Sequence, residues 1–369
     1  MLVILIIFAI ITPRCIQEFI PKVDENKELL VVEAMITDQN RTNSVRLSKS
    51  MPLGKLLIRK PVRSANVTVI DDYGNATVFK ETEPGLYISD SAEFRGHVGR
   101  KYALRIESEG LFYSSDFVEM KPVPPIDSVY WEKVLINPSD IPGRVVEGCK
   151  IYVDTHDPDK KCLYYRWEFV ETWEFRLLYP GINTTCWISE KSKKILVKNT
   201  SIYNQARVSK FPLTFITNET DRLQVRYSIL VKQYSMSAGE YTFWDKVQNI
   251  SENVGSLYDI TPMTIRGNIR CESQPDEFVL GYFSVSAVSE ERIFIRDRFK
   301  GIPNFYKYCP SDTIRNALPT EGRNINWWVI EDHSGPPGNY WLITLHRECV
   351  DCTTRGTNIK PSYWPDDIY

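Results

Sequence analysis

The sequence predicts an all-β protein, with an immunoglobulin-like β-sandwich followed by a second, larger, mainly-β region that contains one inserted helix. Three observations predict this fold class. Apolar and polar residues alternate in short runs, and turn-forming residues separate the runs about every ten residues. A proline-rich segment at 121–125 divides the chain. Apolar residues recur at helical spacing in the segment 238–249.

The composition is that of a chain that buries real cores. Aromatic residues make up 12% of the 369 residues, which argues against general disorder. The formal net charge is −2, so the chain shows no basic footprint for nucleic acid, and we predict no nucleic-acid partner. At this length we expect two or three domains.

The first residues predict export. An unbroken apolar run at 2–11 is too short to span a bilayer, which needs about 20 residues, but it matches the apolar segment of a signal peptide. Cys15 stands shortly after this run, where a lipoprotein acceptor is expected. We therefore predict a signal peptide at 1–14, lipidation of Cys15 and a lipid-anchor tether at 15–28. The alternative is ordinary signal cleavage, which would leave Cys15 as a plain thiol.

Residues 29–121 predict the N-terminal immunoglobulin-like β-sandwich. Ala65, Val67 and Val69 alternate with polar residues, which places one side of a strand in a core. A turn-forming cluster follows at 71–75, and further strands with turn signals between them fill the rest of the segment. No cysteine falls in this stretch, so the inter-sheet disulfide of antibody domains is missing from it.

The second region, 126–369, begins after the stiff proline linker, and a fibronectin-like fold is one option for it. Residues 163–175 predict a long aromatic strand or strand pair with alternating sides. Near the end of the region, strands are expected at 278–287 and 292–295, with a charged turn at 289–291 between them.

The helix predicted at 238–249 has a recognisable start. Ser237 and Glu240 have capping-box spacing, in which the hydroxyl and the carboxylate satisfy each other's backbone N–H groups. The aromatic side chains of the segment recur at helical spacing, and we expect them to pack in a core rather than hold a ligand.

Seven cysteines remain when Cys15 is set aside, and such a number favours an oxidising compartment. Because seven is odd, at least one of them stays unpaired within the chain. Spacing suggests that Cys162 pairs with Cys186, and that Cys309 pairs with Cys349 or Cys352 in the tail. The alternative for the tail motif Cys-x-x-Cys is zinc binding or dithiol exchange, and we favour structural disulfides.

Catalytic motifs are missing from the sequence. It contains no metalloprotease, serine-hydrolase, P-loop or dinucleotide-binding motif, and its four histidines are dispersed. We predict no enzymatic activity, no metal and no cofactor. A glycoside hydrolase with an unrecognised carboxylate pair is the alternative, because such pairs leave no spacing to detect. The candidates for contacts to a glycan or peptide ligand, with burial in the core as the alternative, are Trp173, Trp187, Trp327, Trp328 and Trp364.

Several short motifs together carry a resemblance to a known family. They are IQEFIP at 16–21, LVVEAMITD at 30–38, VRLSKS at 45–50, VPPIDSVY at 123–130, YYRW at 164–167, VLGYF at 279–283, CVDC at 349–352 and KPSYWP at 360–365. With them the chain resembles an uncharacterised family of Bacteroidetes outer-membrane lipoproteins, known only as a domain of unknown function. Members often stand beside TonB-dependent receptors.

The resemblance implies an outer-membrane lipoprotein that acts as a binding or assembly accessory of a TonB-dependent nutrient transporter. It implies a place at the cell surface, with the periplasmic face as the alternative. No catalytic residues are established for the family, so none is carried over. The other functions left open are a free-standing glycan-binding or glycan-hydrolysing surface protein and a structural adhesin.

Overall fold

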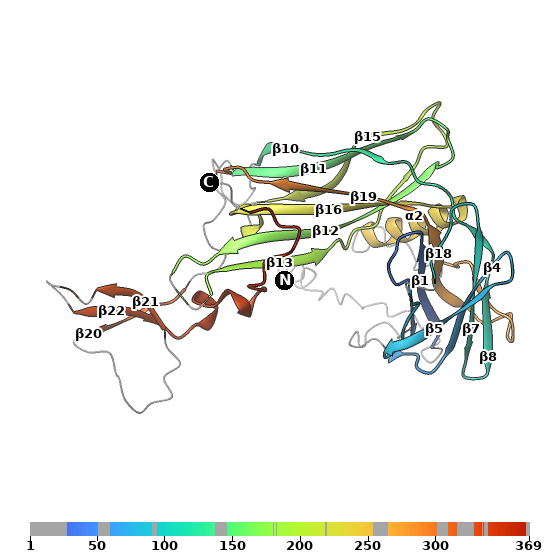
Figure 1. Ribbon diagram of the computed structural model, residues 1–369, viewed down its shortest axis with the longest axis horizontal. Coiled ribbons are helices and arrows are strands. Elements are labelled where there is room, and N and C mark those ends of the chain that lie inside the picture. The colour runs from blue at the N-terminus through green and yellow to red at the C-terminus, as the bar shows by residue number, and fades with distance from the viewer. Residues whose placement is uncertain are drawn as a thin grey trace, which may run out of the picture.

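A computed structural model describes two β-sandwiches, a helix at their junction and a small sheet beyond the second sandwich (Figure 1). The predicted all-β fold with one inserted helix is confirmed. The described residues are 28–50, 60–90, 94–136, 146–179, 181, 183–217, 220–253, 265–300, 309–315, 328–333, 335 and 339–366. The signal peptide, Cys15 and nearly all of the tether lie outside these residues, and so does Trp327.

The first sandwich is formed by eleven strands. Its strands are β1 (Leu30–Thr37), β2 (Ser44–Lys49), β3 (Lys60–Pro61), β4 (Asn66–Asp71), β5 (Ala76–Glu83), β6 (Leu86–Ile88), β7 (Lys101–Ser108), β8 (Leu111–Ser115), β9 (Val118–Glu119), β17 (Ile269–Cys271) and β18 (Val279–Ser286). They are paired in the order β17-β8-β7-β4-β5-β6-β2-β1-β18, with β3 on β2 and β9 on β7. The predicted alternation in β4 is confirmed, since Val67 and Val69 are buried between exposed or half-buried neighbours.

The predicted boundary of this sandwich is wrong, because it is not complete at residue 121. β18 pairs with β1 in parallel, from Leu30 opposite Val279 to Thr37 opposite Ser286. Asn268, just before β17, bridges toward β18 with its side-chain amide: its Nδ2 donates to the Phe283 carbonyl and its Oδ1 accepts from the Phe283 N–H, both at 2.9 Å. A parallel pair needs a long crossover connection, and the second sandwich is part of that connection.

The second sandwich packs a three-stranded sheet on a five-stranded one. The first sheet, in the order β10-β11-β15, consists of β10 (Ile126–Ile136), β11 (Val146–Asp157) and β15 (Ala206–Ile216). The second, in the order β13-β12-β16-β19 with β14 also on β12, consists of β12 (Tyr164–Arg176), β13 (Thr185–Lys191), β14 (Leu196–Asn199), β16 (Arg226–Ser235) and β19 (Val288–Ile295). A short 3-10 helix, η1 (Asp221–Leu223), precedes β16.

The long aromatic strand predicted at 163–175 is β12, and its two sides differ as the alternation requires. Tyr165, Trp167 and Phe169 point into the core of the second sandwich. Trp167 is fully buried, and its indole N–H donates to Gln233 Oε1 at 2.9 Å. The other side of the strand carries the polar residues Arg166 and Glu168, of which Arg166 is nevertheless buried.

The charged turn predicted at 289–291 is wrong, because these residues lie within β19 and pair with β16. Glu290 accounts for the difference: its carboxylate forms ion pairs with Lys232 at 3.2 Å and with Arg41 at 2.8 Å, so a charged residue is stable inside the strand. A single residue, Ala287, separates β18 from β19. The chain therefore passes directly from the first sandwich into the second.

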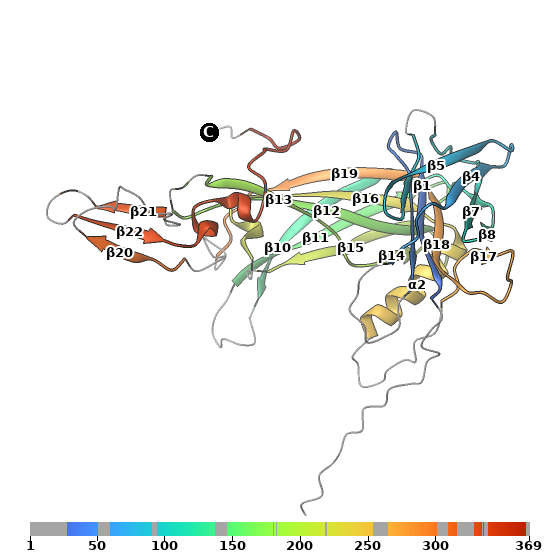
Figure 2. The same cartoon turned by 90° about the horizontal axis from the view of Figure 1, so that it is seen from below.

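The helix α2 (Ala238–Asn253) confirms the prediction and extends it by one turn (Figure 2). Only half of the capping box forms: the Glu240 N–H donates to Ser237 Oγ at 3.1 Å. The Glu240 carboxylate instead accepts from Ser284 Oγ of β18 at 2.6 Å and lies 3.9 Å from Arg166 of β12. Burial raises the pKa of this carboxyl. The helix thus ties the two sandwiches together through one buried carboxylate.

A third sheet lies at the end of the second sandwich that is remote from the first sandwich, as both views show (Figures 1 and 2). It consists of β20 (Asp312–Arg315), β21 (Trp328–His333) and β22 (Tyr340–Thr344), in the order β20-β22-β21. The 3-10 helices η2 (Arg347–Cys349) and η3 (Cys352–Thr354) lead from it back to the second sandwich. In the described part of the chain, no helix is both long and apolar enough to cross a membrane.

Candidate functional site

Two disulfides hold the C-terminal segment in place. Cys186 of β13 is bonded to Cys352 at the start of η3, and Cys309, three residues before β20, is bonded to Cys349 of η2. The second bond confirms one of the two pairings predicted for Cys309. Together they attach the third sheet and the tail covalently to the edge strand of the second sandwich.

The predicted pairing of Cys162 with Cys186 is wrong. Cys162 precedes the start of β12, whereas Cys186 is paired with Phe175 near the other end of that strand, about 40 Å further along an extended chain. Cys162 stays reduced and buried, as do Cys149 and Cys271. Burial raises the pKa of both Cys149 and Cys162 to about 12, which makes them poor nucleophiles at neutral pH.

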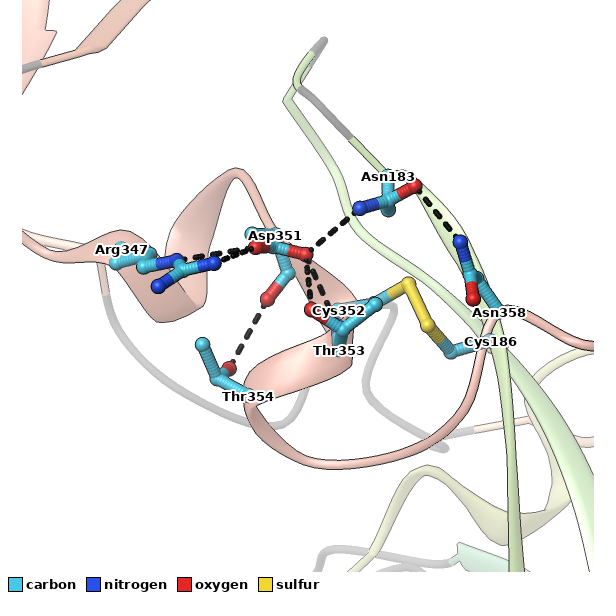
Figure 3. A network of polar contacts seen from close by, with 8 residues as sticks. All are labelled: Asn183, Cys186, Arg347, Asp351, Cys352, Thr353, Thr354 and Asn358. Carbon is cyan, nitrogen blue, oxygen red and sulfur yellow. Dashed lines mark hydrogen bonds and ion pairs between the residues drawn. A yellow bond between two sulfur atoms is a disulfide. The ribbon is translucent and has the colours of Figure 1, made fainter.

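Asp351, between the two tail cysteines, organises the turn that carries them (Figure 3). Its Oδ1 accepts from Asn183 Nδ2 at 3.0 Å and from the Thr353 hydroxyl at 2.6 Å, and its Oδ2 accepts from Arg347 Nη2 at 2.8 Å. The side chain is 1% exposed. The Thr353 hydroxyl, the Asn183 amide and Arg347 hold the pKa of this carboxyl far below its usual range. These donors therefore favour the charged form of the carboxyl.

The segment after η3 returns along β13. Thr357 forms a pair of backbone hydrogen bonds with Trp187, each of 2.9 Å, and Asn358 donates to the side chain of Asn183 at 3.1 Å. Arg355 forms an ion pair with buried Asp221 at 2.9 Å. The tail thus runs beside β13, the edge strand to which the Cys186–Cys352 disulfide joins it.

The tail then covers the outer side of the five-stranded sheet. Trp364 is buried against Phe294 with ring centroids 5.5 Å apart, and its indole N–H donates to Glu174 Oε2 at 3.1 Å. The guanidinium carbon of Arg292 lies over the ring of Tyr363, 3.7 Å from the centroid of that ring. These contacts explain why a polar strand face remains buried at this end of β12.

Comparison with known proteins shows the family of the chain. The family described as Domain of unknown function (DUF4249) matches residues 16–292, which are most of the 369 residues of the chain. The chain belongs to the DUF4249 family. No curated protein matches it. The matched range covers both sandwiches as far as the middle of β19 and includes the strands that return to complete the first sandwich.

Three of the tryptophans proposed as ligand contacts serve the fold of this DUF4249 chain instead. Trp173, Trp187 and Trp364 are buried, and the indole N–H of Trp173 points to Asp221. The prediction is wrong for these three, because the two on paired strands, Trp173 and Trp187, and Trp364 of the tail pack against other elements of the protein rather than facing solvent. Trp328 is half-buried at the start of β21, and its proposed role stays a prediction.

Exposed apolar side chains flank the disulfide-linked turn of the DUF4249 chain. Leu178 of the β12–β13 loop is 54% exposed, Leu345 after β22 is 69% exposed, and Ile359 of the tail is 74% exposed. Leu178 also lines a small hollow with Cys349 and Arg355, which places it beside the turn. Sequence reasoning missed these residues, since isolated leucine and isoleucine in loops form no pattern that separates them from core positions.

The surface around this turn combines exposed apolar side chains with buried carboxylates that already have partners. Among the described residues, no group of three or more histidine, cysteine, aspartate or glutamate side chains is placed to hold a metal ion. The buried carboxylates near the tail, Glu174, Asp221 and Asp351, are held by structural donors. The arrangement supplies a covalently fixed protrusion, with exposed apolar side chains on it and at its junction with the second sandwich.

Proposed function

We propose that this DUF4249 protein is an outer-membrane lipoprotein, held through Cys15, that acts as a binding and assembly accessory of a TonB-dependent nutrient transporter. In this proposal the C-terminal unit, defined as the third sheet with η2, η3 and the tail, is the element that docks on the transporter. The protein would stand at the cell surface. That it has no enzymatic activity stays a prediction.

One observation carries the proposal. The C-terminal unit lies at one end of the body formed by the two sandwiches, and the first described residues lie in the sandwich at the other end. Glu28 and Leu29 lead into β1 of the first sandwich. About a dozen residues separate Cys15 from them, and such a segment reaches at most about 45 Å. An anchor at Cys15 would keep the first sandwich near the membrane and leave the C-terminal unit accessible to a partner.

The C-terminal unit has two features that suit a protein partner. The strands β20 and β21 each pair with β22, and within the described residues their outer edges have no strand partner. Such an edge can accept a strand from another chain. The exposed side chains of Leu345, which follows β22, and of Ile359, in the tail, add apolar area to the C-terminal unit.

The test is affinity purification of the tagged protein from its native membrane, followed by mass spectrometry. We expect a TonB-dependent receptor to be recovered in near-equal amount, together with an acylated Cys15 peptide. The Ile359→Asp variant should lose the receptor. Ile202→Asp is the matched control, because Ile202 is 73% exposed and follows β14, which pairs with the opposite end of β12. A Cys15→Ala variant should be released from the membrane.

Two results would contradict the proposal. One is recovery of the protein alone from detergent extracts. The other is equal loss of the receptor in the Ile359→Asp variant and its control, which would place the docking surface elsewhere. A free-standing glycan-binding protein is the second candidate, and a polar concavity on the first sandwich favours it.

A further inference from the structure

The first sandwich carries an open concavity of about 440 Å³, far from the C-terminal unit. It lies between the β4–β5 turn and the segment that precedes β7. Its volume is within the range of small-molecule binding sites. Polar side chains dominate its walls, and the lining residues are Asp71, Asn75, Thr77, Phe94, Arg95, His97, Arg100 and Tyr102.

Both walls of this concavity are fixed by hydrogen bonds before any ligand arrives. On one wall, Asp71 Oδ1 accepts from the backbone N–H groups of Tyr73 and Asn75, both at 2.9 Å. On the other, the His97 N–H donates to the hydroxyl of buried Tyr102 at 2.9 Å. A site of fixed shape loses little conformational entropy when a ligand binds.

At one side of the concavity two carboxylates face a single guanidinium, which leaves an excess of negative charge there. Arg100 forms ion pairs with Asp71 at 2.6 Å and with Asp72 at 2.7 Å, and its guanidinium stacks on the ring of Tyr73 at 3.6 Å. These two carboxylates hold the guanidinium in the wall and repel an anionic ligand. The tyrosine ring is 76% exposed, so an aromatic ring stands in the turn between the lining residues Asp71 and Asn75.

Three polar groups remain available for a ligand. Arg95 uses its Nε to donate to the Asp38 carbonyl at 2.6 Å, and its charge also acts on the Asp38 carboxylate, but its two terminal nitrogens form no hydrogen bond or ion pair among the described residues. The side chains of His97 and Thr77 likewise have no partner there. Arginine and imidazole groups on one wall and a hydroxyl group on the other, with the exposed ring of Tyr73 in the adjoining turn, can bond to the paired hydroxyls of a sugar ring.

We propose that this concavity is a binding site for a neutral saccharide. An apolar ligand would desolvate the polar walls without compensation, and an anion would meet the two carboxylates beside Arg100. The proposal does not depend on the accessory role, since the site lies on the first sandwich and the proposed docking surface lies on the C-terminal unit.

The experiment is isothermal titration calorimetry of the purified full-length protein with four neutral hexasaccharides: those of maltose, cellulose, xylan and mannan type. A galacturonic-acid hexamer is the anionic probe. The test variant is Arg95→Ala combined with His97→Ala, and both residues are exposed. Arg105→Ala is the matched control, because Arg105 is an exposed arginine of β7 that does not line the concavity.

We expect at least one neutral hexasaccharide to bind, and the double variant to weaken its binding at least about tenfold while the control leaves it unchanged. Unchanged thermal unfolding of the variants would show that the fold is kept. The proposal is overturned if no neutral probe binds, if only the galacturonic-acid hexamer binds, or if the double variant binds as tightly as the wild type. None of these results would bear on the co-purification of a receptor.

Discussion

Removal of the Cys186–Cys352 disulfide should destabilise the protein more than removal of any other described covalent link. The two cysteines are 166 residues apart, compared with 40 for the Cys309–Cys349 bond. In the chain-entropy relation, a loop of that length restricts the unfolded state by about 5 kcal/mol, and the shorter loop by about 4 kcal/mol. We expect the double variant Cys186→Ala with Cys352→Ala to lose several kcal/mol of unfolding free energy.

The assay is equilibrium unfolding in guanidinium chloride, with limited proteolysis at low denaturant to show where the chain opens first. The tail of the variant still has the Thr357 backbone bonds and the Trp364 contacts, so cleavage should begin near η3 rather than within β12 or β16. A loss of less than about 1 kcal/mol would refute the reasoning, as would a tail that stays resistant to protease.

Three further predictions concern the buried contacts at the tail and at the junction. Trp364→Ala should cost about 3–5 kcal/mol in the same unfolding assay, and a change close to zero would mean that the tail is not part of the folded core. Glu240→Ala should cost roughly 3 kcal/mol by leaving the buried guanidinium of Arg166 without this partner, and a double-mutant cycle with Arg166→Met should reveal coupling, whereas additive effects would contradict it. Because the pKa of Asp351 is lowered in the folded state, its stabilising effect is complete above about pH 4 and is lost as the pH falls further. Unfolding of the wild type and of Asp351→Asn should therefore differ at pH 7 and converge in acid, and a constant difference would contradict this origin.

Local patterns were sufficient to predict most strands and the helix. The alternation in β4 and β12 places Val67, Val69, Tyr165 and Trp167 in cores, because side-chain direction has a period of two in any strand. The start of α2 was predictable from Ser237, since a hydroxyl before the first turn satisfies a free N–H group. Such features depend only on neighbouring residues.

Features that depend on distant partners were not predictable. The charge of Glu290 indicated a turn, but Lys232 and Arg41, far away in sequence, make it stable in a strand. The pairing of β1 with β18 leaves no local signal, because a parallel partner is reached only after a long crossover. For the same reason cysteine spacing could suggest the Cys309–Cys349 bond but not a partner for Cys186.

The interleaved path of the chain bears on both proposed sites. The chain crosses between the sandwiches at the 121–125 linker, again between α2 and β17, and finally at Ala287, so no single hinge joins them. At Ala287 the backbone N–H donates to Ser235 Oγ at 3.0 Å, and the same hydroxyl donates to the Lys121 carbonyl at 2.6 Å. One side chain of β16 thus holds two of the three crossings together. Glu240 is also buried between the sandwiches, where it contacts Ser284 of the first and Arg166 of the second. A motion of one sandwich relative to the other would therefore break the Ser235 hydrogen bonds and the Glu240 contacts together. A saccharide bound on the first sandwich would therefore be held at a fixed position relative to the C-terminal unit, as an accessory that presents a ligand to a transporter requires.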